Sequence, residues 1–176
     1  MQDRFSRFEF LNSITWYAVD DEMSIGAFGM GHIPDVALRW QNDWSWVDDI
    51  MFGLPQSSEY KLLEHPEIDA VWASARDLTP LGRDHLRGTL KNSAGNSMAE
   101  LPRRGIFQFN GEPAPLGILP AKFLLRAFPT KPLKLNDVPE TAERITETVR
   151  LPTRFGSITQ LDILRVAPHQ VADGGW

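Results

Sequence analysis

The sequence predicts an α+β protein built on a mainly antiparallel sheet. Three observations favour this class: a β-hairpin pattern close to the N-terminus, a helical middle, and an amphipathic helix late in the chain. Strand patterns at both ends of a helical centre are typical of α+β proteins, whereas α/β proteins alternate strands and helices. We expect one globular domain over residues 1–176, which is a usual domain size.

The N-terminal hairpin is predicted by two runs rich in β-branched and aromatic residues, 13–19 and 24–28. A short acidic turn at residues 20–22 separates them, and turns favour such solvated acids. Because successive side chains of a strand point to opposite faces, Trp16 is expected on one face of the hairpin and Tyr17 on the other.

A long helix is predicted from Asp35, after a loop with two glycines and a proline at residues 29–34, and it ends at Gly53. Apolar residues recur there at steps of three and four, which is the spacing of one helical face. They are Val36, Trp40, Trp44, Val47 and Met51. A break near Asn42-Asp43 fits the same pattern, with Asp43 as the cap of a shorter second helix.

The rest of the middle is expected to be helical as far as a polar loop. Short helices are predicted at residues 59–64, from Pro66, and from the cap-and-proline pair Thr79-Pro80. Residues 90–101 are polar, with Asn and Ser recurring around Gly95, and predict a mobile loop.

Strand patterns return in the last third of the chain, at residues 105–109, 121–128 and 155–163. Between the last two, Asn136-Asp137 marks the start of an amphipathic helix. The apolar face of this helix is made of Val138, Ala142, Ile145 and Val149. The C-terminal tail, from residue 172 to the end, is expected to be loose.

Composition narrows the classes of function. The net charge is −5, from 18 Lys and Arg against 23 Asp and Glu. An acidic surface argues against nucleic-acid binding, which needs a basic footprint, but it permits a basic protein partner. The chain has no cysteine for a disulfide or thiolate metal site. Neither a signal peptide nor an apolar run of roughly 20 residues is present, so we expect a cytoplasmic protein without a membrane partner.

Three segments carry strand starts, turns and a capped helix in a recognisable order: residues 16–34, 104–107 and 131–139. Together they resemble a loosely defined group of uncharacterised bacterial proteins that open with a Trp/Asp β-hairpin. The resemblance covers most of the chain, and its motifs are structural, so it implies no catalytic residues. Small bacterial proteins of this style include candidate immunity proteins against toxins, and the resemblance implies that role by association alone.

The preferred functional surface is an aromatic residue rimmed with acids. Trp46 falls off the apolar face of the predicted helix and is expected to be exposed. Asp43, Asp48 and Asp49 surround it in the sequence. An exposed tryptophan flanked by carboxylates is a suitable contact surface for a basic protein partner.

An alternative site for a small ligand, or for a hydrolase-like enzyme, is the 29–34 loop. His32 in this loop is a candidate general base, and Asp20 and Asp21 in the hairpin turn are the candidate carboxylates. A concave pocket that holds His32 within hydrogen-bond reach of a carboxylate would favour this alternative.

Sequence motifs for chemistry are otherwise missing. The chain has no Gly-x-Ser-x-Gly, no phosphate-binding Gly-Lys-Ser/Thr loop, and no paired histidines, and its acidic turn lacks the spacing of a calcium loop. We therefore predict no metal and no cofactor. The sequence favours a non-enzymatic protein-interaction module, of which an immunity protein is one kind.

Overall fold

The computed structural model describes residues 14–63, 65, 100–112, 119–166 and 169–170. The helices predicted from Pro66 and from Thr79-Pro80, most of the 90–101 loop, and the C-terminal tail lie outside these residues. Among the helices that are described, none is long and apolar enough to cross a bilayer.

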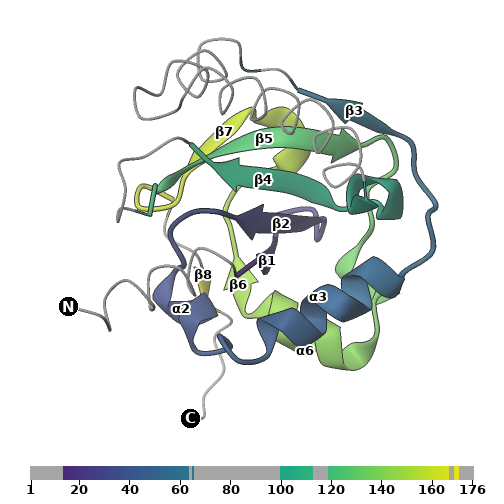
Figure 1. Cartoon of the computed structure of the whole chain (residues 1–176), viewed down its shortest axis with the longest axis horizontal. Helices are drawn as coiled ribbons and strands as arrows, with labels where there is room; N and C mark the ends of the chain where they lie inside the picture. Colours follow the sequence, from purple (N-terminus) through teal and green to yellow (C-terminus); the bar gives the residue numbers. More distant parts are fainter. Residues whose placement is uncertain (1–13, 64, 66–99, 113–118, 167–168, 171–176) are drawn as a thin grey trace, which may run out of the picture.

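One sheet organises the described part of the chain (Figure 1). Its strands lie in the order β3-β5-β4-β2-β1-β6-β8, and β7 pairs with the first half of β5. The strands are β1 (Trp16–Val19), β2 (Ile25–Gly29), β3 (Tyr60–Leu62), β4 (Phe107–Gly111), β5 (Lys122–Pro129), β6 (Val149–Arg150), β7 (Gln160–Asp162) and β8 (His169–Gln170).

The sheet is mixed, so the predicted mainly antiparallel arrangement is wrong. β1 pairs antiparallel with β2, with Trp16 opposite Phe28 and Val19 opposite Ile25. On either side of this pair the next strand is parallel, because β4 lies along β2 and β6 lies along β1. Strand direction depends on how the connections cross the sheet, and the hydrophobic pattern of a strand does not record it.

Helices pack beside the sheet, and those whose full extent is described are α2 (Asp35–Leu38), α3 (Trp44–Gly53), α6 (Glu140–Glu147) and three 3₁₀ helices, η1 (Pro102–Arg104), η2 (Leu135–Asp137) and η3 (Phe155–Ser157). Figure 1 shows α3 beside α6, and both contact β1. The predicted amphipathic helix is α6, with Ala142 and Ile145 buried. It begins at Glu140, because Asn136 and Asp137 belong to η2.

The predicted long helix is divided in two. α2 ends at Leu38 and α3 begins at Trp44, so the version with a break near Asn42-Asp43 is confirmed. Asp43 occupies the N-cap position of α3, but its side chain makes no capping hydrogen bond. Instead, the indole Nε1–H of Trp44 donates to the backbone oxygen of Ala37 at 2.7 Å and ties α3 to α2.

Two other segments differ from the prediction. The short helix predicted at residues 59–64 is wrong, because Tyr60–Leu62 forms strand β3 at the edge of β5. So short a segment gains few internal hydrogen bonds as a helix, whereas Lys61 pairs with Phe128 in the sheet. The strand predicted over residues 155–163 is shortened to β7, because its first residues form η3.

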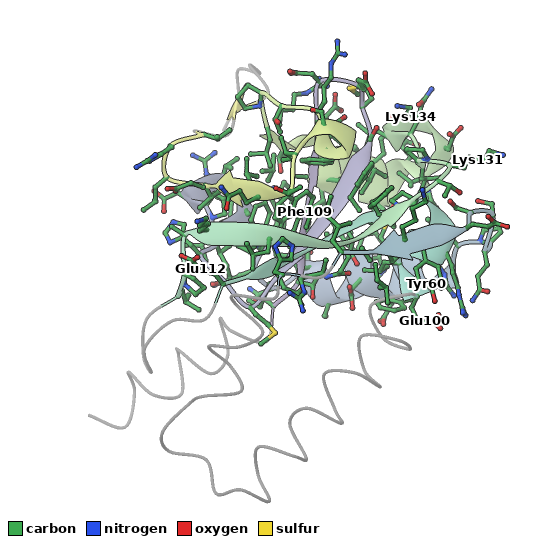
Figure 2. All side chains as sticks on the ribbon, turned by 90° about the horizontal axis from the view of Figure 1, so that it is seen from above. Tyr60, Glu100, Phe109, Glu112, Lys131 and Lys134 are labelled. Carbon is green, nitrogen blue, oxygen red and sulfur yellow. The ribbon has the colours of Figure 1, made fainter. Side chains whose placement is uncertain are left out.

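Aromatic rings fill one face of the sheet. Phe28 on β2 lies between Trp16 on β1 and Phe109 on β4, with ring centroids 4.3 and 4.7 Å away and interplanar angles of 12° and 4°. Phe123 and Phe155 meet Phe28 edge-on, at 5.3 and 5.8 Å. Figure 2 shows Phe109 among the strands in the middle of the molecule. These five buried rings form the aromatic cluster of the core.

Replacing Phe28 by Ala is expected to lower the free energy of unfolding by about 3–5 kcal/mol, the usual cost of truncating a buried aromatic side chain. The ring contacts with Trp16 and Phe109 are lost and a cavity remains. Urea denaturation followed by circular dichroism measures the change. Phe52→Ala is the control, because Phe52 is 39% exposed and its truncation is expected to cost about 1 kcal/mol or less. Equal losses in the two variants would contradict the assigned core.

Candidate functional site

The carboxylate of Asp20 is a structural group of the hairpin turn. Its Oδ1 accepts from the backbone N–H groups of Glu22 at 2.9 Å and Ser24 at 2.8 Å. Its Oδ2 accepts from the backbone N–H of Phe155 at 2.8 Å. The residue is only 4% exposed. Asp20 therefore holds η3 against the turn between β1 and β2, a role that its place in an acidic turn did not indicate.

The structure does not bring His32 together with Asp20 and Asp21. Both aspartates precede β2, and His32 follows it, so they lie at opposite ends of that strand. The six steps from Ser24 to Met30 correspond to about 20 Å at roughly 3.3 Å per residue. His32 is half-buried, and its backbone N–H donates to the oxygen of Pro120 at 2.8 Å. Within the described ranges, no group of three or more His, Asp or Glu side chains is placed to hold a metal ion.

The outward side of α3 carries the exposed part of the predicted partner surface. Trp46 is 43% exposed, while Trp44, Val47 and Met51 point into the core. Residues three apart on a helix are neighbours on its surface. Asp43 and Asp49, three residues before and after Trp46, therefore flank it, and Asp49 is exposed.

Asp48 belongs to a different side of the same helix. Two residues correspond to about 200° of rotation, so Asp48 lies nearly opposite Trp46. The hydroxyl of Tyr17 on β1 donates to Asp48 Oδ1 at 2.5 Å. The structure thus separates Asp48 from the surface that Trp46, Asp43 and Asp49 form, because its carboxylate serves as a hydrogen-bond acceptor between helix and sheet.

Burial governs the protonation of this pair. The pKa of Asp48 is raised chiefly because burial disfavours its charged form; the charge of Asp49 adds to this, and the hydrogen bond from Tyr17 opposes it. The pKa of the Tyr17 phenol is also raised, first by burial and then by the neighbouring carboxylate. The phenol therefore stays a hydrogen-bond donor across the physiological range of pH.

A cavity of about 270 Å³ adjoins Asp48. Sequence reasoning missed it, because its walls come from the segment before β1, the turn between α2 and α3, and the first half of α3. The lining residues are Ile14, Thr15, Gln41, Asn42, Trp44, Ser45 and Asp48. The sequence did contain one indication of the cavity, because Asp48 lies next to the apolar face of the predicted helix.

A second, wider depression of about 680 Å³ lies beside β3, and Figure 2 shows Tyr60 on this side of the molecule. The guanidinium of Arg103 lies 5.4 Å from the centroid of the Tyr60 ring. Glu59 and Arg103 both line the depression. Because the described part of the lining has one acidic and one basic side chain, it indicates no preference for a ligand of either charge.

No family model, curated protein or solved structure with which the chain was compared matches it. The functional argument therefore rests on the geometry of α3 and its surroundings.

Replacing Asp20 by Ala is expected to lower the free energy of unfolding by about 3 kcal/mol or more, since each hydrogen bond to a charged group contributes roughly 1.5–3 kcal/mol. Three backbone N–H groups lose their acceptor. Chemical denaturation of Asp20→Ala and Asp21→Ala tests this, because Asp21 is exposed and its loss is expected to cost about 0.5 kcal/mol or less. Similar stabilities of the two variants would rule out the structural role of Asp20.

Asp48→Asn tests the charge of Asp48, because the amide oxygen still accepts from Tyr17. The pKa of Asp48 is higher in the folded protein than in the unfolded chain. Between these two pKa values the folded protein binds more protons than the unfolded chain, so ionisation of Asp48 lowers the free energy of unfolding. As the pH rises, this loss of stability begins near the ordinary carboxyl pKa of about 4 and is complete once the pH exceeds the raised pKa of Asp48. The variant is expected to be at least as stable as the wild type at pH 7.

The stability advantage of Asp48→Asn is expected to shrink at about pH 3.5, where Asp48 is protonated in both states. Urea denaturation at both pH values measures it. Asp35→Asn removes an exposed carboxylate and serves as the control for the general effect of charge. An advantage that is the same at both pH values, or a less stable variant at pH 7, would contradict the assignment.

Proposed function

We propose that the protein is a non-enzymatic interaction module that binds a basic protein through the outward side of α3. The observation that carries the proposal is the exposure of Trp46 between Asp43 and Asp49. Partially exposed tryptophans are enriched among the residues that dominate binding energy at interfaces. Carboxylates at the rim of such a residue attract a positively charged partner and orient it.

The charge of the whole chain supports a basic partner. The net charge is −5, and a protein of this sign accelerates the approach of a cationic protein through long-range attraction. The outward side of α3 adds local negative charge at Asp49, which is exposed. Contact of a basic partner there buries the tryptophan while the carboxylates stay near water.

The kind of module that we propose is a cytoplasmic bacterial immunity protein, which neutralises a toxin by covering its functional surface. The resemblance of the N-terminal segments to small bacterial proteins motivates this choice. Small-ligand binding or hydrolase-like catalysis at the 29–34 loop is the weaker alternative, because His32 and the carboxylates it would need lie beyond opposite ends of β2.

Trp46→Ala is expected to weaken binding of the partner at least about tenfold, because truncation of a central interface tryptophan typically costs more than about 1.4 kcal/mol. The partner is first captured from native lysate with the wild-type protein and identified by mass spectrometry. Calorimetry with the purified partner then compares the variants. Asp43→Asn combined with Asp49→Asn is expected to weaken binding mainly at low salt, since exposed charges are screened at high salt.

Leu164→Ala is the control, because Leu164 is 69% exposed beside β7, away from α3. It is expected to bind as the wild type does. Circular dichroism confirms that each variant keeps its fold. Unchanged affinity in Trp46→Ala, or an equal loss in Leu164→Ala, would eliminate the outward side of α3 as the partner surface.

A further inference from the structure

The cavity beside Asp48 has a lining with one negative charge. Asp48 and Trp44 face it from α3, Thr15 from the segment that leads into β1, and Gln41 and Asn42 from the turn between α2 and α3. None of the described lining residues is Lys, Arg or His. Among the described residues of its walls, the cavity therefore has an acidic group without a basic counterpart.

The carboxylate of Asp48 retains hydrogen-bonding capacity toward the cavity. An ionised carboxylate offers about four acceptor positions. Tyr17 occupies one of them through its hydroxyl. Within the part of the chain that the structure describes, no other donor is bonded to Asp48. A ligand that donates hydrogen bonds would therefore meet an acceptor that is already held in place by the sheet.

We infer that this cavity binds an organic cation, an alkylammonium or guanidinium group, with Asp48 as its counter-ion. The hydroxyl and amide oxygens of Thr15, Gln41 and Asn42 are acceptors for the remaining N–H donors of the cation.

The size of the cavity agrees with a small cationic group. Its volume of about 270 Å³ lies just below the range of roughly 300–1,000 Å³ that is usual for drug-sized ligands. At about 30 Å³ for a water molecule in the liquid, a cavity of this kind holds several water-sized groups. The end of an arginine or lysine side chain, or a free amine of similar length, fits this space.

Burial of Asp48 gives a cation a further advantage. Burial raises the pKa of this carboxyl because the ionised form has lost part of its hydration. A cation in the cavity would compensate the charge at the point where water no longer does so. This inference does not depend on a partner at Trp46, which lies nearly opposite Asp48 on α3.

The experiment is a titration with n-butylammonium and n-butylguanidinium, observed by the NMR signal of the Trp44 indole N–H. The indole N–H donates to the backbone oxygen of Ala37, and Trp44 lines the cavity. The chemical shift of this N–H therefore reports a ligand in the cavity. Both cations are expected to shift it saturably, and 1-butanol, a neutral probe of similar shape, is expected to leave it unchanged at the same concentration. Absence of a shift with both cations, or an equal response to 1-butanol, would overturn the inference.

Two aspartate variants provide the matched comparison. Asp48→Asn is expected to weaken binding of both cations about tenfold or more, as the loss of a charged hydrogen-bond acceptor requires. Asp49→Asn removes the same charge from an exposed neighbour and is expected to weaken binding much less, because solvent and salt screen it. Equal losses in the two variants would exclude a specific site, and Trp46→Ala is expected to bind the cations normally.

A titration with a blocked amino acid distinguishes the two possible sources of the cation, a side chain of a polypeptide and a free small molecule. Nα-acetyl-arginine methylamide carries the guanidinium on a peptide backbone, whereas n-butylguanidinium is free. Binding of both supports a cavity that receives an arginine or lysine side chain of a polypeptide. Binding of the free cation alone supports a small-molecule site.

Discussion

The carboxylate of Asp20 is the interaction on which much of this structure depends. It is bonded to the turn between β1 and β2 through Glu22 and Ser24, and to η3 through Phe155. The ring of Phe155 in turn packs against Phe28 and lies so close to Gly26 that a Cβ atom there would come within 2.8 Å of it. One buried acid thus joins a turn near the start of the described chain to the aromatic cluster and to a segment 135 residues later.

The hydrogen bond between Tyr17 and Asp48 joins β1 to α3 on the opposite face of the sheet. With Asp48 bonded to β1 and Trp44 tied to Ala37, the helix has little freedom to turn about its axis. Trp46 is then directed away from the core. The exposure of this tryptophan therefore follows from the burial of Trp44, Val47 and Met51 together with two polar contacts on the inner side of the helix.

The hydrophobic periodicity of the sequence predicted the elements that short stretches of the chain determine. The strands around Trp16 and Phe28 and the amphipathic helix α6 have clear periodicities. The break before Trp44 was one of two alternatives consistent with the sequence. The parallel neighbours of β1 and β2, and the strand at Tyr60–Leu62, were not predictable, because both depend on contacts with distant strands. Trp46 is exposed, as its place off the apolar face predicted, whereas Asp48 lies on another side of α3, where it accepts from Tyr17. The binding role of Trp46, Asp43, Asp48 and Asp49 stays a prediction.

Asp49 connects the two surfaces of α3 that the structure separates. It is exposed beside Trp46, and its charge also raises the pKa of Asp48. Electrostatic interactions extend over about 8–10 Å at moderate salt, whereas hydrogen bonds require direct contact. A cation placed on either side of α3 therefore interacts with Asp49, but only a cation in the cavity can bond to Asp48. The two proposed sites share a long-range field and differ in their short-range chemistry, so substitutions on one side of the helix test each proposal separately.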